Sequence, residues 1–300
     1  MNHFKDIILS LRPYQWSKNI LLFAGLFFSL SLFELPLLLK ATYGFIAFVM
    51  ASSSVYLFND LKDIEKDKLH PVKRNRPIPS GLVSKKVATY LSASLFVLSL
   101  LISVYLINNL FAYIITSYFL INIAYTCCFK NIVILDVFII AVGFLLRTSA
   151  GIVAVEVEFS SWIIIATFLL ALLLAIGKRR GEMVNLKENA TQHRKALHNY
   201  SLDYIDNILN IVTAATIVTY ALYTIADETA ARFRTNMLIL TTPVIIYMLF
   251  RYLYMLQLEN QGEDPVKMIL KDKHLVIGGI IWLLMVAFII YLKFVIQFSI

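Results

Sequence analysis

The sequence contains few charged residues for a chain of its length. Only 15% of its 300 residues are Asp, Glu, Lys or Arg, whereas globular chains average about 25%. Hydrophobic residues make up 59%, against about 45–50% in globular chains. A single water-facing surface cannot cover so many apolar side chains. The composition therefore excludes an ordinary soluble enzyme and predicts an integral membrane protein.

Cysteine and histidine are also scarce. The two cysteines, Cys127 and Cys128, are adjacent, which excludes a disulfide framework and a CxxC metal site. The five histidines all fall outside the long apolar blocks, so we expect them to be solvated rather than catalytic. They are His3, His70, His193, His198 and His274.

Nine apolar blocks are long enough to cross a membrane, which takes about 20 residues. Backbone groups in lipid must be satisfied within the segment, so we expect helices. The sequence thus predicts an all-α integral membrane protein, a single domain over residues 1–300 with nine transmembrane helices. The blocks are 19–39, 42–58, 87–107, 110–129, 132–153, 160–177, 207–226, 237–257 and 274–297.

Basic residues predict the orientation of these helices. With the N-terminus in the cytoplasm, 21 of the 27 Lys and Arg residues fall in cytoplasmic segments and four fall outside. This bias follows the positive-inside rule, and an odd number of spans places the C-terminus outside. The same rule explains the net charge of +8, so we expect no nucleic-acid partner. Two long cytoplasmic loops, 59–86 and 178–206, are candidates for a single active-site mouth.

An acidic motif ends the second block. At 100° per residue, Asn59, Asp60, Asp63 and Asp67 share one helix face and Glu65 points away. Clustered carboxylates repel each other unless a cation neutralises them, and oxygen ligands without His or Cys favour Mg²⁺. The motif predicts metal ligands at all four positions and catalytic roles for the three aspartates. The alternative is a solvated helix end with alternating charges.

A basic stretch follows at once. Lys73, Arg74 and Arg76 come shortly after the acidic helix, and such side chains bind phosphate well. We expect them to bind an anionic substrate. The alternative is positive-inside anchoring, which requires no ligand.

These two motifs resemble the UbiA superfamily of intramembrane prenyltransferases. Asn59-Asp60-x-x-Asp63-x-x-x-Asp67 and the later Arg76-Pro77-Ile78-Pro79-Ser80-Gly81 are similar to that family's first Asp-rich motif. The resemblance implies a ring of nine helices around a cavity that opens to the cytoplasm. It also implies that this motif binds Mg²⁺ and a diphosphate leaving group.

The chain departs from the usual pattern of that family at its second Asp-rich motif. The corresponding stretch is basic and reads Gly177-Lys178-Arg179-Arg180-Gly181-Glu182. This version resembles a narrower branch, the polyprenyl-phosphate phosphoribosyltransferases of the decaprenyl-phosphate type. Further stretches resemble the same branch: Arg12-Pro13-x-Gln15-Trp16-x-Lys18-Asn19, Leu135-Asp136-Val137, Leu146-Arg147, Ala150-Gly151, Arg251-Tyr252 and Gly262-Glu263-Asp264-Pro265.

Membership of the branch would define the reaction. Phosphoribose would pass from phosphoribosyl pyrophosphate to a membrane polyprenyl phosphate, with Mg²⁺ as cofactor and pyrophosphate released, and cell-wall precursor synthesis would be the expected setting. The acceptor needs no His or Cys base, because a phosphate monoester is largely dianionic at pH 7. One alternative is a prenyltransferase acting on an aromatic or quinone precursor; another is a non-catalytic transporter or lipid-binding protein.

The remaining candidate residues follow from this chemistry. Lys178, Arg179 and Arg180 would bind phosphate groups beyond the diphosphate. Glu182 is a catalytic candidate that would contact ribose hydroxyls or a second Mg²⁺; alternatively it pairs with Lys178. We also expect substrate contacts from five residues in or near the spans; the alternatives are structural pairing for the two charged residues of the fifth span and interfacial anchoring for the tyrosine. They are Lys18, Tyr125, Lys130, Asp136 and Arg147.

Overall fold

The computed structural model describes residues 3–70, 72–158, 160–186, 200–259 and 265–297. These residues are almost entirely helical and include no strand. Eight of the helices are long and apolar enough to cross a membrane. The all-α membrane class predicted from composition is confirmed. The chain divides into two compact units, Met1–Phe159 and Ser160–Ile300, which are described separately below.

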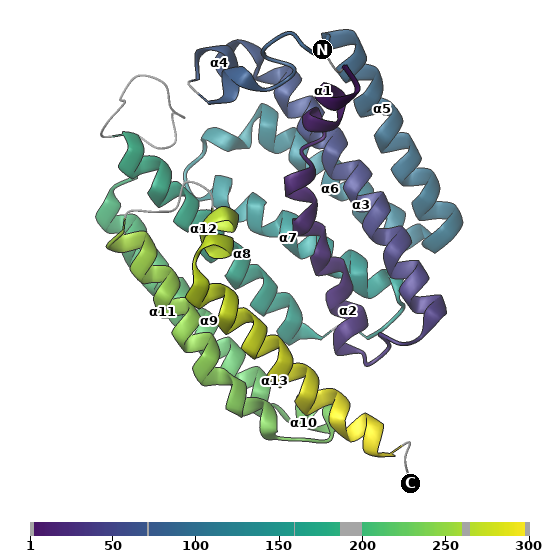
Figure 1. Ribbon diagram of the computed structural model, residues 1–300, viewed down its shortest axis with the longest axis vertical. Helices are drawn as coiled ribbons and strands as arrows, with labels where there is room; N and C mark the ends of the chain where they lie inside the picture. The colour runs from purple at the N-terminus through teal and green to yellow at the C-terminus, as the bar shows by residue number, and fades with distance from the viewer. Residues whose placement is uncertain (1–2, 71, 159, 187–199, 260–264, 298–300) are drawn as a thin grey trace. The chain divides into compact units, whose positions relative to one another are not determined.

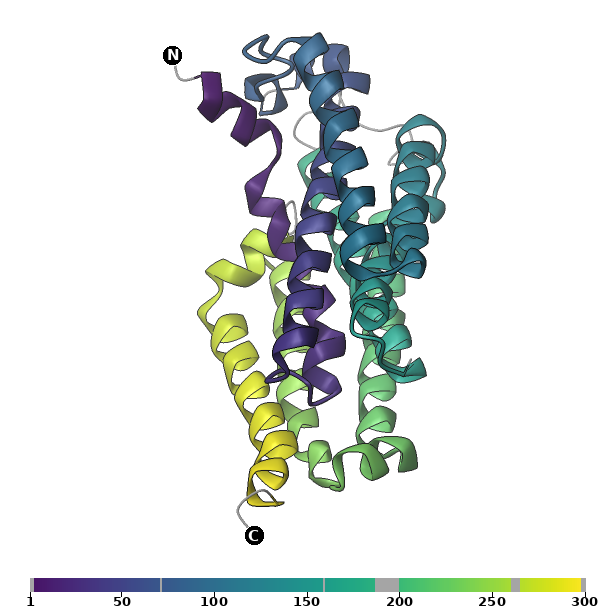
Figure 2. The ribbon, with the colours of Figure 1, turned by 90° about the vertical axis from the view of Figure 1, so that its right-hand side faces the viewer.

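The first unit contains seven α-helices (Figure 1). In both views α3 and α5 lie side by side (Figures 1 and 2). The helices are α1 (His3–Ser10), α2 (Phe23–Phe28), α3 (Leu35–Lys62), α4 (Ile64–Leu69), α5 (Lys85–Ile102, extended by a π-helical turn at Ser103–Ile107), α6 (Asn109–Cys127) and α7 (Leu135–Ala154).

The prediction of one helix over residues 19–39 is wrong. Residues Pro13–Leu22 form a 3₁₀-helix, α2 ends at Phe28, and α3 begins at Leu35. A 3₁₀-helix rises about 2.0 Å per residue and an α-helix about 1.5 Å. Ten and six residues therefore extend about 29 Å, close to the ~30 Å hydrocarbon thickness. The segment is long enough to cross, so the count of nine spans stays a prediction.

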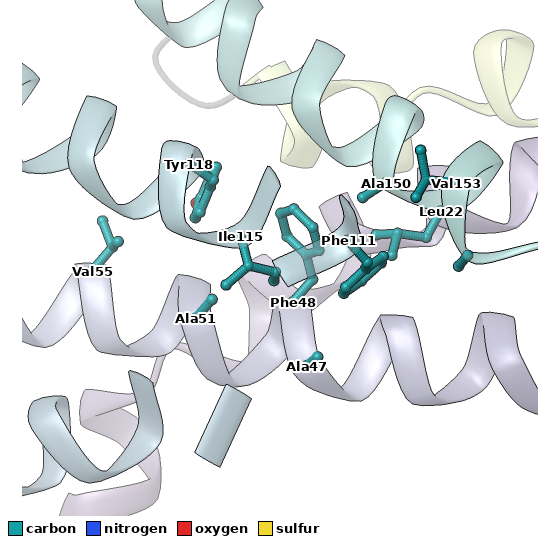
Figure 3. Packing of buried hydrophobic residues seen from close by; sticks show 11 residues of the cluster. Leu22, Ala47, Phe48, Ala51, Val55, Phe111, Ile115, Tyr118, Ala150 and Val153 are labelled. Atoms are coloured by element: carbon teal, nitrogen blue, oxygen red, sulfur yellow. The ribbon is translucent and has the colours of Figure 1, made fainter. Parts of the chain in front are cut away.

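The core of the first unit forms where α3, α6 and α7 meet the N-terminal segment (Figure 3). Phe48 packs edge-to-face against Phe111, with ring centroids 6.0 Å apart, and lies 5.2 Å from the ring of Tyr118. Small residues on α3, Ala47 and Ala51, let these rings approach the helix. The aromatic cluster fixes α3 against α6 and thereby positions the end of α3, which carries the acidic motif.

The N-terminal segment packs backbone to backbone against α7. A Cβ added to Gly151 would lie 2.6 Å from the carbonyl carbon of Leu22 and 2.7 Å from its Cα. No side chain fits at those distances, so glycine is required for this approach. Nearby, the Arg147 Nε donates a 2.8 Å hydrogen bond to the Asn19 side chain. These contacts hold the 3₁₀ segment in place next to the core.

The described residues of the second unit form six α-helices (Figure 1). Two pairs pack closely, α8 with α9 and α11 with α13. Helix α8 is longer than the predicted 160–177 block, and its last turns include Lys178 to Glu182, which the sequence analysis had assigned to a loop. The helices are α8 (Ser161–Leu186), α9 (Leu202–Ile225), α10 (Asp227–Phe233), α11 (Thr242–Gln257), α12 (Pro265–Lys271) and α13 (Lys273–Gln297).

Candidate active site

The acidic motif lies at the junction of α3 and α4. Asp60 is in the last turn of α3, Asp63 ends that helix and Asp67 lies on α4. Backbone hydrogen bonds from Asp63 to Asn59 (3.0 Å) and from Asp67 to Asp63 (2.8 Å) continue the helical spacing across the junction. The backbone therefore keeps the four residues at the intervals that the sequence analysis assumed.

Two arginines neutralise the first and the last of these carboxylates. The Arg76 Nη1 donates to both Asp60 and Asp67 at 3.0 Å, and Arg12 forms a second ion pair with Asp60. Only 3% of the Asp60 side chain and 9% of the Asp67 side chain are exposed. Because unpaired carboxylates are costly to bury, Arg12 and Arg76 are essential partners. The sequence analysis did not include Arg12 among the site residues, although Arg12 begins one of the stretches that resemble the phosphoribosyltransferase branch.

Asp63 pairs with a different cation from the one that Asp60 and Asp67 share. The Lys130 Nζ lies 2.6 and 2.8 Å from its two carboxylate oxygens. Lys130 follows α6, whereas Arg12 and Arg76 flank the motif within the N-terminal part of the unit. At the other end, the Asn59 side chain accepts a hydrogen bond from Thr126 on α6. The motif is thus tied to α6 through Asn59 and to the 3₁₀ turn after α6 through Asp63.

The donor set suits Mg²⁺. Asn59 and the three aspartates supply only oxygen ligands, which Mg²⁺ prefers. Within the described part of the chain, no three His, Cys, Asp or Glu side chains are close enough together to hold one metal ion. Mg²⁺ usually takes one or two carboxylates and completes its shell with water and phosphate. The residues therefore fit magnesium with substrate oxygens better than a closed protein site.

The other predicted residues of this region differ in their surroundings. Lys73 is half-buried and Arg74 is exposed, both on a short 3₁₀ turn, Lys73–Asn75. Arg76 is joined to the motif by ion pairs with Asp60 and Asp67. Tyr125 is half-buried near the end of α6. Substrate contacts by Lys73, Arg74 and Tyr125 stay predictions.

Arg147 is held entirely by neutral protein groups. Its guanidinium donates to the Asn19 side chain, the Gly143 carbonyl (2.8 Å) and the Tyr118 hydroxyl (2.7 Å), and it stacks 4.7 Å from the Tyr118 ring centroid. These contacts match the structural pairing that the sequence left open as the alternative for this residue. A role for Arg147 in substrate binding stays a prediction.

Two further predicted residues lie near α7. Asp136 is fully buried in the first turn of α7. It is eleven residues from Arg147, about 16 Å along the helix axis. Lys18 is half-buried, and its Nζ lies 5.9 Å from the ring centroid of Phe144 on α7. Binding of substrate by Asp136 and Lys18 also stays a prediction.

In the second unit, the predicted basic stretch forms the end of α8. Arg179 is buried and forms an ion pair with Glu182, one turn later. Arg180 is buried as well. Its Nε donates to Asp206 on α9 at 2.6 Å, and its Nη1 donates to the backbone carbonyl of Leu256 on α11. Lys178 is the half-buried member of the stretch.

Arg180 therefore links three helices of the second unit. The sequence analysis predicted it as a phosphate ligand and did not assign any role to Asp206, its main partner. The two residues are 26 positions apart along the chain, across residues 187–199, which lie outside the described structure. No local pattern indicates such a contact. The basic charge at this end of α8 consequently has a structural component as well as any ligand role.

Another ion pair of the second unit lies near the start of α13. The Arg251 Nη2 donates to Asp272 at 2.7 Å, and the backbone N–H of Leu275 donates to the same carboxylate at 2.8 Å. The hydrogen bond from Arg251 lowers the pKa of Asp272, so this carboxylate is charged at neutral pH. The pair joins α11 to the N-terminus of α13. The neighbouring Gly262-Glu263-Asp264 stretch of the resemblance lies outside the described residues.

Comparison with known proteins assigns the chain to a family. The sequence profile of the UbiA prenyltransferase family matches residues 20–277. The chain belongs to the UbiA prenyltransferase family. It is also 33% identical over 237 residues to a protein of Mycolicibacterium smegmatis named decaprenyl-phosphate phosphoribosyltransferase, covering 76% of this chain and 73% of that protein. A Corynebacterium glutamicum protein of the same name is 26% identical over 294 residues, covering 95% and 87%. The chain is thus a UbiA-family transferase, as the motifs predicted.

Solved UbiA structures have the same fold. A UbiA homologue from Archaeoglobus fulgidus, described as bound to DMAPP and Mg²⁺, superposes with a TM-score of 0.69 at 22% identity, covering 93% of this chain and 96% of that one. A structure described as digeranylgeranylglyceryl phosphate synthase superposes with a TM-score of 0.64 at 21% identity, covering 96% and 98%. The predicted UbiA-like fold is therefore confirmed.

Proposed function

We propose that this UbiA protein transfers 5-phosphoribose from phosphoribosyl pyrophosphate to a membrane polyprenyl phosphate, releasing pyrophosphate. The observation that carries the proposal is the basic end of α8, Lys178 to Arg180, where the resemblance leads us to expect a second acidic motif. A reaction between two phosphorylated substrates has more anionic groups to bind than one Mg²⁺ motif can neutralise. The names of the two bacterial relatives support the same reaction.

We assign the pyrophosphate leaving group to the acidic motif. Asn59, Asp60, Asp63 and Asp67 would supply oxygen ligands to Mg²⁺, one or two carboxylates to each ion, and Mg²⁺ when bound acts as a Lewis acid toward a departing diphosphate. The three cations that pair with the aspartates would then be available to contact the diphosphate oxygens, because Mg²⁺ would neutralise the carboxylates in their place. They are Arg12, Arg76 and Lys130.

The bond changes require no protein base. An oxygen of the acceptor phosphate forms a bond to the anomeric carbon of the ribose, and the bond from that carbon to the pyrophosphate oxygen breaks. The pyrophosphate leaves with the electron pair. Positive charge develops on the ribose ring in between, as in glycosyl transfer, where a nearby carboxylate helps. Glu182, half-buried at the end of α8, is the catalytic candidate for that role.

The proposal predicts a specific effect of Lys178. Lys178→Ala should raise the KM for phosphoribosyl pyrophosphate or for polyprenyl phosphate by about tenfold, because a charge-assisted hydrogen bond to phosphate contributes about 1.5–3 kcal/mol. Steady-state kinetics of the purified protein in detergent would measure it. Lys271→Ala is the matched control, since it removes an exposed lysine of the same unit and should leave both KM values unchanged. Unchanged KM values in Lys178→Ala as well would contradict the assignment of the α8 stretch.

The alternative function is transfer of a prenyl group from a prenyl diphosphate to an aromatic or quinone precursor. The acidic motif suits this reaction equally well, because a prenyl diphosphate also releases pyrophosphate. When the acceptor is neutral, that reaction has no additional phosphate group for the basic end of α8 to bind. For this reason the phosphoribosyl reaction is the better supported of the two.

We further propose an orientation in the cell membrane. The N-terminus, the acidic motif and the basic end of α8 would face the cytoplasm, and the C-terminus would lie outside. The excess of Lys and Arg in the segments assigned to that side supports this arrangement. A soluble donor made in the cytoplasm would then reach both clusters without crossing the membrane.

A further inference from the structure

One tyrosine of the second unit has a buried hydroxyl with no hydrogen-bond partner. Only 3% of Tyr252, on α11, is exposed, and its Oη forms no hydrogen bond with the residues that the structure describes. A buried hydroxyl without a partner destabilises a protein. Phenylalanine would fill the same space without that penalty. Packing alone therefore does not account for this hydroxyl.

The hydroxyl lies at the point where α8 changes from apolar to basic. It sits against the backbone of Gly177, so that a Cβ added there would overlap Oη and come within 3.2 Å of the Tyr252 Cζ and 3.0 Å of the Leu256 Cδ1. Gly177 thus provides the space that the hydroxyl occupies. The next residues along α8 are Lys178 and Arg179.

Two of the basic residues that follow Gly177 on α8 are held by carboxylates of the protein. Arg179 is buried beside Glu182, and Arg180 is fixed by Asp206. Both arginines are therefore oriented by the protein before any ligand binds. A tyrosine hydroxyl is neutral at pH 7 and donates one hydrogen bond, which suits a phosphate or ribose oxygen that enters next to these cations.

We propose that the Tyr252 hydroxyl donates a hydrogen bond to an oxygen of the phosphorylated sugar, in a subsite formed by Gly177 and the basic residues that follow it. This inference rests on the proposed function, because it takes phosphoribosyl pyrophosphate as the ligand. It adds a specificity-determining residue from α11 to a site that the sequence motifs place on α8. The hydroxyl would have a hydrogen-bond partner only when the phosphorylated sugar is bound.

The test separates ligand binding from stability. Tyr252→Phe should weaken binding of phosphoribosyl pyrophosphate by about ten- to a hundredfold, the usual effect of losing a hydrogen bond to a charged group. The melting temperature should stay the same or rise, because the unpaired hydroxyl is gone. Calorimetric titration of the full chain in detergent with Mg²⁺ and no acceptor gives the Kd, and thermal unfolding of the same samples gives the stability.

Tyr220→Phe is the matched control. The Tyr220 hydroxyl is hydrogen-bonded to Thr241 (2.6 Å) and Trp282 (2.7 Å) within the same unit. Removing it should lower the melting temperature and leave the Kd unchanged. Binding should therefore weaken only in Tyr252→Phe, and the melting temperature should fall only in Tyr220→Phe.

A variant Tyr252→Phe that binds as tightly as the wild type would overturn the inference while leaving the proposed function intact. A fall in its melting temperature with an unchanged Kd would do the same, because the hydroxyl would then have a structural partner such as a buried water. If the wild type itself does not bind phosphoribosyl pyrophosphate, the proposed function and this inference are both wrong.

A second pair of variants tests the geometry without any ligand. Gly177→Ala should lower the melting temperature of the wild type, because its Cβ overlaps the Tyr252 hydroxyl. The decrease should be clearly smaller in a chain that also has Tyr252→Phe, since the overlapping atom is missing. Equal decreases in both backgrounds would show that the hydroxyl does not lie against Gly177.

Discussion

Asp63→Asn should lower turnover by about 10³-fold with little change in folding. The substitution keeps the size of the side chain and removes the charge that we assign to Mg²⁺ binding, and loss of metal-based charge stabilisation is worth about 4 kcal/mol or more in the transition state. Asp63 suits this test better than Asp60. Its side chain is 26% exposed and forms an ion pair with Lys130, whereas Asp60 is buried and pairs with two arginines.

Glu65→Gln makes the same chemical change two residues away. Glu65 is exposed and pairs with Lys68 on the surface, an interaction worth about 0–1 kcal/mol. The turnover of Glu65→Gln should equal that of the wild type. Product formation at saturating substrates, measured over a Mg²⁺ titration, compares the two variants. If Asp63→Asn retains full turnover at every Mg²⁺ concentration, the metal assignment is wrong.

Gly151→Ala should destabilise the first unit strongly. Its Cβ would lie 2.6 Å from a backbone carbon of Leu22, and backbone atoms cannot move aside as a flexible side chain can. Overpacking in a core costs typically 1–3 kcal/mol and sometimes more. We expect the high end or beyond, because the whole Pro13–Leu22 segment must shift away from α7. Thermal unfolding in detergent, followed by size-exclusion chromatography, measures the loss.

Gly143→Ala is the control within the same helix. A Cβ at Gly143 would be 3.7 Å from the Arg147 Nη1 and 3.8 Å from the Tyr118 ring, which is ordinary van der Waals contact. Alanine also has a higher helix propensity than glycine, so stability should stay the same or rise slightly. If both variants lose stability equally, the close approach of α7 to Leu22 is not present in the protein.

The sequence was sufficient to predict the fold class because the signals involved are local and strong. Long apolar blocks separated by charged loops have few physical solutions other than membrane helices. The acidic motif could be predicted for a similar reason, since its residues follow one helical face at fixed intervals. The N-terminal segment was misjudged because hydropathy does not distinguish an α-helix from a 3₁₀-helix. The close packing that accompanies the 3₁₀-helix here depends on Gly151, about 130 residues later.

The partners of the site residues were the part that sequence reasoning could not supply. Asp206 is 26 residues from Arg180, and Lys130 is 67 residues from Asp63. Both contacts depend on how whole helices pack. Arg147 illustrates the same difficulty. An arginine within a membrane span is a functional candidate by default, and the sequence does not show which protein groups accept its hydrogen bonds. Tyr252 lacked any sequence signal beyond its place in a resemblance motif, and only its burial and missing partner distinguish it.

A donor competition tests the central claim most directly. The purified protein in detergent with Mg²⁺ would receive phosphoribosyl pyrophosphate and a prenyl diphosphate together, with polyprenyl phosphate and an aromatic acid as acceptors. Lipid mass spectrometry would identify the products. The account predicts a polyprenyl phosphate that has gained one phosphoribosyl unit, with no prenylated aromatic. A prenylated aromatic without that lipid product would contradict it and would make the basic end of α8 a structural feature.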